Sequence, residues 1–158
     1  MHYGEVYTTW MYLFTEQGMI ASYQTLMNHT GDADLKKLIA EAINEANSEC
    51  KKIKELLKHN GIALPPASPE RPECNLEDIP AGARFTDPEI AGMLAMNSAG
   101  GLVTCSTIMG QSIREDIGLM FGQFHTSKSL FAAKVLQLNK EKGWLIPPPL
   151  HLDTPNNH

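Results

Sequence analysis

A proline-rich segment divides the chain into two helical halves. Residues 62–86 contain five prolines and therefore cannot form a regular helix. Fully extended, 25 residues reach about 80 Å, whereas a helix of 25 residues is about 38 Å long. The segment is thus long enough to cross the whole length of a helical bundle, and it predicts two helical halves joined by a crossover.

Apolar residues recur every three or four positions on both sides of this segment, which is the spacing of one helix face. The pattern predicts four helices, over about residues 4–28, 33–59, 88–110 and 113–142. A long crossover between helices 2 and 3 is typical of ferritin-like bundles. The sequence therefore predicts an all-α, ferritin-like four-helix bundle as a single domain over residues 1–158. It also predicts a Pro-rich crossover at 62–86 and an extended C-terminal tail at 144–158.

Residue types that favour helix ends mark several boundaries. Asp32 is a predicted N-cap, and Asn60-Gly61 is a predicted stop for the second helix. Asp87, with proline at the next position, is the predicted N-cap of the third helix. Ser112, with glutamate three residues later, is typical of a capping box that opens the fourth helix. The predicted inward positions of the first helix are Val6, Trp10, Leu13, Gln17, Ile20, Gln24 and Met27. The tail residues predicted to pack back on the helices are Trp144, Leu145, Ile146 and Leu150.

Charge and cysteine content narrow the class of protein. The formal net charge is −5 and no lysine- or arginine-rich run is present, which argues against nucleic acid or an anionic membrane surface as the main partner. The cysteines Cys50, Cys74 and Cys105 are odd in number and form no C-x-x-C pair, which favours a reducing compartment. The N-terminus has no basic region followed by an apolar one, so no signal peptide is predicted. These features predict a cytoplasmic protein.

The third predicted helix is unusual because residues 90–113 contain no charge. A run of this length is long enough for a membrane span, but polar residues such as Asn97, Thr104 and Gln111 disfavour that interpretation. A helix buried on more than one side is the better prediction. Small residues that would let a second helix approach closely are Gly92, Ala95, Ala99, Gly100 and Gly101. We therefore expect homodimerisation through this helix.

Metal ligands of the usual ferritin-like kind are missing. Di-metal bundles of this topology use a glutamate on each of two helices and a Glu-x-x-His pair on each of the other two. No Glu-x-x-His occurs here, and the third helix has no acid after Glu89. A reduced site for a single divalent metal is conceivable from Glu16, Glu49 and His125. The alternative is that Glu49 belongs to a solvated row of glutamates at four-residue spacing, so neither a metal nor another cofactor is expected.

Recognised catalytic motifs are also absent. The sequence contains no P-loop, dinucleotide fingerprint, G-x-S-x-G or H-E-x-x-H motif. Cys50 is a lone helical cysteine, and such residues more often act as small buried hydrophobes than as nucleophiles. No catalytic residue is therefore predicted, and a non-enzymatic protein is favoured.

Several short motifs resemble a known family over nearly the whole chain. They are Glu5 with Trp10 and the following Tyr12, the run 84–87 (Arg-Phe-Thr-Asp), the run 113–116 (Ile-Arg-Glu-Asp), and Lys142-Gly143 followed by Pro147-Pro148. Together they resemble a bacterial ferritin-like family of unknown function from spore-forming Firmicutes, related to spore coat protein F. The resemblance implies a four-helix fold, a forespore or spore coat location and no assigned activity. It also implies that Arg114 and Asp116 form a structural pair.

Three functions remain open from the sequence. The favoured one is a non-catalytic structural or interaction protein, associated with the spore or its coat by resemblance. The second is a metal-binding oxidoreductase with the reduced site named above. The third is a small-molecule-binding bundle whose pocket lies near Gly100 and Gly101, among Asn97, Thr104 and the glutamines of the first helix.

Overall fold

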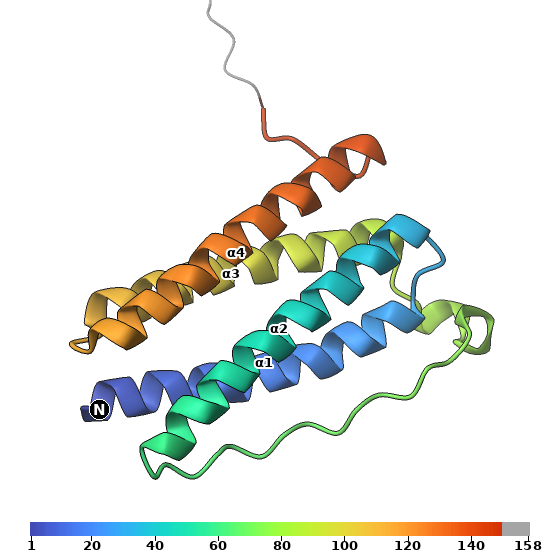
Figure 1. Cartoon of the computed structure of the whole chain (residues 1–158). Coiled ribbons are helices and arrows are strands. Elements are labelled where there is room, and N and C mark those ends of the chain that lie inside the picture. The colour runs from blue at the N-terminus through green and yellow to red at the C-terminus, as the bar shows by residue number, and fades with distance from the viewer. Residues whose placement is uncertain (150–158) are drawn as a thin grey trace, which may run out of the picture.

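The computed structural model describes residues 1–149. It confirms an all-α, ferritin-like four-helix bundle (Figure 1). The helices are α1 (Tyr3–Asn28), α2 (Ala33–His59), α3 (Asp87–Gln111) and α4 (Glu115–Glu141), and the crossover holds two short 3-10 helices, η1 (Leu76–Asp78) and η2 (Ala81–Ala83). All eight α-helix ends lie within two residues of the predicted positions.

The bundle consists of two antiparallel hairpins, α1–α2 and α3–α4 (Figure 1). The crossover returns from the end of α2 to the opposite end of the bundle, as Figure 1 shows, so α3 runs parallel to α2 and antiparallel to α1. Each hairpin is closely packed within itself, whereas α1 and α3 make few contacts with each other. This sparse contact leaves room between α1 and α3 for the site described below.

One side of α1 holds the crossover in place. The Trp10 indole Nε1 donates a hydrogen bond to the carbonyl of Ala63 at 3.0 Å, near the start of the crossover. At the far end of α1, the Asn28 amide donates to the carbonyl of Pro72 at 3.0 Å and accepts from the backbone N–H of Cys74 at 3.2 Å. These contacts satisfy backbone groups in a segment whose prolines prevent it from forming a helix.

This role of α1 corrects the predicted inward positions of Gln17 and Gln24. The Gln24 side chain accepts from the backbone N–H of Arg71 at 2.9 Å, and the Gln17 amide lies 3.4 Å from the carbonyl of Pro66. Both glutamines therefore face the crossover and not the bundle centre. The sequence pattern missed this because it treats α1 as having one buried face. The buried residues of α1 are Glu5, Thr9, Tyr12, Leu13, Gln17, Ala21, Tyr23 and Leu26.

The predicted capping box at Ser112 is wrong. The Ser112 hydroxyl donates to the carbonyl of Ile108 at 2.7 Å and so completes the end of α3. The residues that lead into the next helix are instead held by α1, because Glu5 Oε1 accepts from the backbone N–H groups of Ile113 at 3.0 Å and of Arg114, the N-cap residue, at 2.9 Å. Burial raises the pKa of Glu5, but these backbone donors and His2 outweigh it, so the pKa lies below its usual value.

The other predicted ends agree more closely with the structure. Asp32 is the N-cap of α2, and Gly61 follows that helix with φ +69°, a conformation that glycine adopts without strain. At α3 the capping box is formed by Thr86 and Glu89. Asp87, the predicted N-cap, instead accepts a 2.6 Å hydrogen bond from the Thr30 hydroxyl, which joins α3 to the α1–α2 turn.

Within a single chain the uncharged α3 is buried on one face only, so it is not a central helix, and burial of a second face against another copy stays a prediction. Its opposite face is open to solvent, with Met96 75% and Val103 67% exposed. Across residues 1–149, no helix has both the length and the apolar character that crossing a membrane requires. In the tail, Trp144 packs on the core, but Ile146 is 92% exposed. Leu150 lies outside the described residues.

Candidate functional site at the bundle centre

A charged residue interrupts the apolar core midway along α4. The buried side of α4 runs through Phe121, Phe124, Phe131 and Val135, and Lys128 occupies the helical position between Phe124 and Phe131. Its side chain is only 14% exposed. The core consequently divides into two apolar clusters, one on either side of this lysine.

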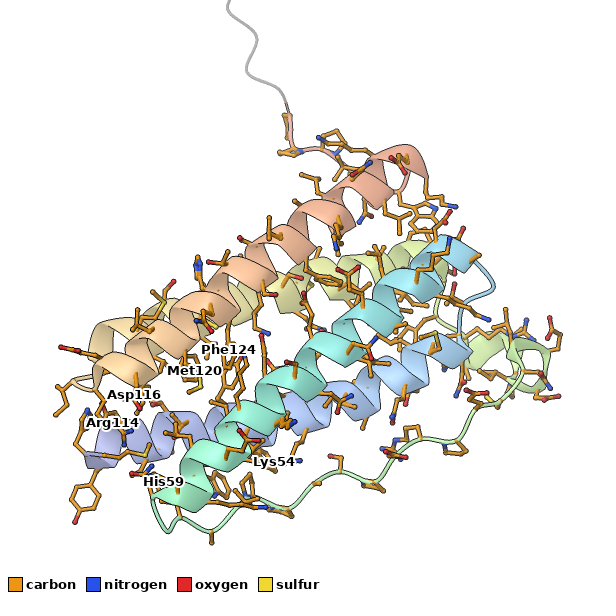
Figure 2. All side chains as sticks on the ribbon, in the orientation of Figure 1. Lys54, His59, Arg114, Asp116, Met120 and Phe124 are labelled. Atoms are coloured by element: carbon orange, nitrogen blue, oxygen red, sulfur yellow. The ribbon has the colours of Figure 1, made fainter. Side chains whose placement is uncertain are left out.

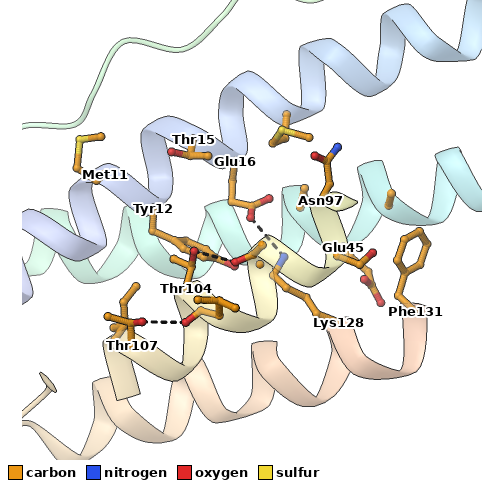
Figure 3. A pocket seen from close by; sticks show the side chains of 18 of the residues that line it. Met11, Tyr12, Thr15, Glu16, Glu45, Asn97, Thr104, Thr107, Lys128 and Phe131 are labelled. Carbon is orange, nitrogen blue, oxygen red and sulfur yellow. Dashed lines mark hydrogen bonds and ion pairs between the residues drawn. The ribbon is translucent and has the colours of Figure 1, made fainter. Parts of the chain in front are cut away.

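Two helices, α1 and α2, supply the partners of Lys128. The Lys128 ammonium lies 2.9 Å from Glu49 Oε2 on α2 and 3.3 Å from Glu16 Oε1 on α1. The Tyr12 hydroxyl donates to the same Glu49 oxygen at 2.7 Å. Figure 3 shows the lysine reaching across the bundle toward Glu16. We call Glu16, Glu49, Lys128 and Tyr12 the central ion cluster.

Gly101 on α3 provides the path for the lysine side chain. A Cβ atom placed on Gly101 would lie 2.8 Å from Lys128 Cδ and 3.3 Å from Lys128 Cε. Because the ammonium is held by two carboxylates, the stem cannot move aside without weakening those ion pairs. The neighbouring Gly100 has no atom within 4 Å of its Cβ position and borders open space. The two adjacent glycines therefore have different structural roles.

Burial and charge act together on the ionisation of this cluster. Burial alone would lower the pKa of Lys128, but Glu16 and Glu49 outweigh it, so the pKa lies above its usual value and the lysine stays protonated. Burial raises the pKa of Glu49 more than Lys128 lowers it. Burial and the two nearby carboxylates also raise the pKa of Tyr12. Within the described residues, Glu49 Oε1 is buried without a hydrogen-bond partner.

The structure brings together two of the three predicted metal candidates. Glu16 and Glu49 converge on one point, but Lys128 Nζ occupies that point. His125 is half-buried and forms no ion pair or hydrogen bond with them. Among residues 1–149, no group of three or more His, Cys, Asp or Glu side chains is arranged to hold a metal ion. An ammonium between the carboxylates supplies the positive charge that a divalent cation would supply, so the donor set does not fit a metal.

The glutamate row on α2 is not uniformly solvated. Glu49 is 4% exposed and Glu45 is half-buried, with Oε1 accepting from the Ser127 hydroxyl at 3.1 Å. Burial is the largest cause of the raised pKa of Glu45. Glu41, nearer the helix start, forms an ion pair with Lys134. The alternative interpretation of the row as a solvated face is therefore wrong for Glu49.

A pocket of about 480 Å³ lies above the central ion cluster, between α1 and α3. Glu16, Glu45 and Lys128 line its charged end, and Tyr7, Met11 and Val103 belong to its walls. Figure 3 shows the charged side chains at one end of the pocket and Met11 and Thr107 at the other. Gly100, Gly101, Asn97 and Thr104 also line it, which is the region named from the sequence for a small-molecule site.

Sequence reasoning missed Lys128 and Tyr12. A signal for Lys128 was present, since the apolar stripe of α4 steps seven residues from Phe124 to Phe131 and a helix of 3.6 residues per turn must place one residue between them on the same face. Tyr12 gave no such signal, because its partner Glu49 is 37 positions away in the sequence.

Cys50 agrees with its predicted role as a small buried hydrophobe, and Cys105 is buried beside it. Cys105 and Cys50 are fully packed in the same apolar cluster, and burial raises the pKa of each thiol to about 11. Such thiols are protonated at neutral pH and are weak nucleophiles.

The pair Arg114–Asp116 holds the start of α4 against α2 (Figure 2). Arg114 donates from Nε and Nη2 to the two carboxylate oxygens of Asp116 at 3.0 and 2.6 Å. Its remaining amine Nη1 donates to the Asn60 side chain at 3.0 Å, at the end of α2. All three groups are taken up by contacts between helix ends, which supports a structural role for this pair.

Fold and site together define a ferritin-like four-helix bundle whose centre holds a lysine–glutamate cluster. The family model described as "Protein of unknown function (DUF3231)" matches residues 1–156, and the chain belongs to this family. The chain is 59% identical over 152 residues to the uncharacterised protein YvdQ of Bacillus subtilis (strain 168). The aligned region covers 96% of this chain and 89% of YvdQ. The relation to spore coat protein F stays a prediction.

Two solved structures are similar to this one. A crystal structure of a candidate spore coat protein from Bacillus halodurans C-125 has a TM-score of 0.95 and 60% identity, with 96% of each chain covered. A conserved hypothetical protein from Mycobacterium tuberculosis has a TM-score of 0.71 and 12% identity, covering 87% of this chain and 98% of that one. At that identity the second likeness shows the fold alone.

Proposed function

We propose that the chain is a non-catalytic structural or interaction protein of the spore coat that assembles as a homodimer through the exposed face of α3. The observation that carries the proposal is the solvent-exposed, uncharged face of that helix. The 60% identical structure from Bacillus halodurans, described as a candidate spore coat protein, supports the location.

The exposed face of α3 has the spacing of a helix–helix contact. Its exposed residues include Met96, Gly100, Val103, Thr107 and Gly110, which follow one another at intervals of four and three. This is the heptad spacing with which one helix presents a seam to another. We call these five residues the docking face. The glycines within it lower the height of the surface and allow a second backbone to approach.

A second copy of the chain is the occupant that best fits this face. No charged residue lies between Glu89 and Arg114, although the chain as a whole carries a net charge of −5. In a two-fold dimer each patch meets its own copy, so a charged patch opposes like charges. The docking face is uncharged, so two copies can meet there without repulsion. Two copies that met through the rest of the surface, which carries the net negative charge, would repel each other.

Light scattering at micromolar concentration tests the dimer. Wild-type protein is expected at twice the chain mass of 17.4 kDa. Val103→Glu places two like charges in the seam and is expected to give the single chain mass. The matched control is Leu119→Glu, which changes an apolar residue on α4 that is 70% exposed. A wild-type monomer, or a dimer lost in Leu119→Glu and kept in Val103→Glu, would overturn the proposal.

The location is tested by expressing this chain in sporulating Bacillus subtilis whose own YvdQ, 59% identical, has been deleted. A fluorescent fusion of the chain is expected in the coat fraction extracted from purified spores. Retention is expected to fall in the Val103→Glu variant. A fusion that stays in vegetative cytoplasm and is absent from spores contradicts a coat role.

A further inference from the structure

We propose that the pocket between α1 and α3 binds a small amphipathic amine, with its ammonium group against Glu16 and Glu45 and its apolar part between Met11 and Val103. The pocket volume of about 480 Å³ falls in the range of about 300–1,000 Å³ that is usual for small-molecule sites. Its form matches such sites as well, since apolar walls surround a few polar groups at one end.

The balance of charge at the charged end of the pocket favours a positively charged ligand. Three carboxylates, those of Glu16, Glu45 and Glu49, face the single ammonium of Lys128. Glu45 forms no ion pair with any residue of the described chain, and of the two lysines that act on its charge, Lys128 and Lys134, each is paired with other glutamates. A ligand carboxylate would have to displace Glu16 from Lys128 and then lie among the remaining carboxylates. A ligand ammonium meets unpaired carboxylate oxygens directly.

Unused acceptors point to the same class of ligand. In the described residues, the second carboxylate oxygens of Glu16 and Glu45 accept no hydrogen bond. An ammonium group offers three donors and no acceptor, so it can satisfy both oxygens at once. The aromatic ring of Tyr23 also lines the pocket, and aromatic rings attract ammonium groups through their faces.

Three ligands with the same eight-carbon chain test which ligand charge the pocket prefers. They are octylamine, which is positive, octan-1-ol, which is neutral, and octanoate, which is negative. At pH 7 the amine is protonated like a lysine side chain. Isothermal titration calorimetry below micelle-forming concentrations is expected to show octylamine binding at least about tenfold more tightly than octanoate, with octan-1-ol between them. Octylamine is also expected to raise the thermal midpoint of the protein. Octanoate binding as tightly as octylamine overturns the assignment, and so does absence of octylamine binding at millimolar concentration.

Two variants locate the binding. Glu45→Gln keeps the shape of the side chain and removes its charge, so octylamine affinity is expected to fall about fivefold while octan-1-ol affinity is unchanged. Gly100→Leu fills the pocket from a position with open space and is expected to abolish binding of all three. Gly110→Leu is the matched control on the same helix, outside the pocket. Retained octylamine binding in Gly100→Leu refutes the site. Met96, Gly100, Val103 and Thr107 of the docking face also line the pocket. Gly100→Leu and Gly110→Leu both alter the docking face, and only Gly100→Leu also fills the pocket, so comparing the two separates loss of the dimer from loss of the site. Glu45 lies on α2, outside the docking face, so the Glu45→Gln test does not depend on the dimer.

Discussion

Replacing Lys128 with methionine removes the only positive charge from the central ion cluster and keeps the length and apolar stem of the side chain. In the native protein the ammonium contacts Glu49 at 2.9 Å and Glu16 at 3.3 Å. The side chains of Lys128, Glu16 and Glu49 are 14%, 12% and 5% exposed, so water cannot take over the role of the lysine. The variant leaves two carboxylates facing each other in an apolar core.

The expected cost follows from this burial. Removing one partner of a buried ion pair destabilises a protein by about 3–5 kcal/mol, because the other charge stays buried and unpaired. For a chain of this size, each kcal/mol shifts the thermal midpoint by about 2–4 °C. The Lys128→Met variant is therefore expected to unfold roughly 6–20 °C below wild type. Circular dichroism at increasing temperature and urea titration measure the two quantities.

A second substitution tests whether the loss arises from the ion pair. Glu49→Gln in the Lys128→Met background removes the stranded charge, so the double variant is expected to recover more than half of the lost stability. A Lys128→Met variant within about 0.5 kcal/mol of wild type would refute the reasoning, since that is the size of an exposed salt bridge. Equal instability of the single and double variants would also refute it.

The pH dependence of the stability difference between wild type and Lys128→Met is an independent test of the stranded carboxylate. Without Lys128, the pKa of Glu49 in the folded variant is expected to rise further above its unfolded value of about 4.3. A carboxyl whose folded pKa is raised favours the fold below the unfolded pKa, and that contribution is lost as pH rises through the folded pKa. The gap between wild type and Lys128→Met is therefore expected to be smaller at pH 5 than at pH 8. A gap that widens on acidification contradicts a stranded carboxylate.

Four further substitutions test individual contacts. Gly101→Ala is expected to destabilise by about 1–3 kcal/mol because of the 2.8 Å approach to Lys128. Gly100→Ala, on the same helix, adds a Cβ that meets no other atom and is expected to stabilise the protein by about 0.5–1 kcal/mol. Urea midpoints of the two variants show whether one loses stability and the other gains it. Glu5→Gln is expected to cost about 1.5–3 kcal/mol at pH 7, and because the folded pKa of Glu5 is lowered, the gap should close as pH falls below about 4. Trp10→Phe is expected to speed Glu-C cleavage within the crossover about two- to fivefold, followed by mass spectrometry.

The four helices and the crossover could be predicted because their signals are local. Periodic apolar residues, Asp32 as an N-cap and the prolines of residues 62–86 act within a few positions of themselves. The Ser112 capping box failed for the opposite reason, since Ser112 ends α3 and the two residues after it are held by Glu5, more than 100 residues earlier in the chain. A local pattern cannot reveal a competing acceptor that only the folded chain brings close.

The site was partly visible in the sequence. Glu16 and Glu49 were identified as candidate ligands of a reduced metal site, and the structure does bring them together, around Lys128. Their partner was missed because a lysine in an apolar stripe resembles a break in the pattern. The pocket region was predicted from Gly100 and Gly101, but their separate roles depend on the path of Lys128, which only the three-dimensional arrangement gives.

Directional contacts set how the two hairpins lie against each other. Apolar faces pack in several registers with similar energy, because the hydrophobic effect has no direction. Here Lys128 on α4 binds Glu16 and Glu49 on the other hairpin, and Glu5 on α1 binds the backbone of the α3–α4 turn at Ile113 and Arg114. Because these two attachments lie at different heights, sliding the α3–α4 hairpin by a helical turn would break both. The attachment at Lys128 also places the lysine beside Gly101, at the charged end of the pocket, so the contact that interrupts the core also shapes the candidate binding site.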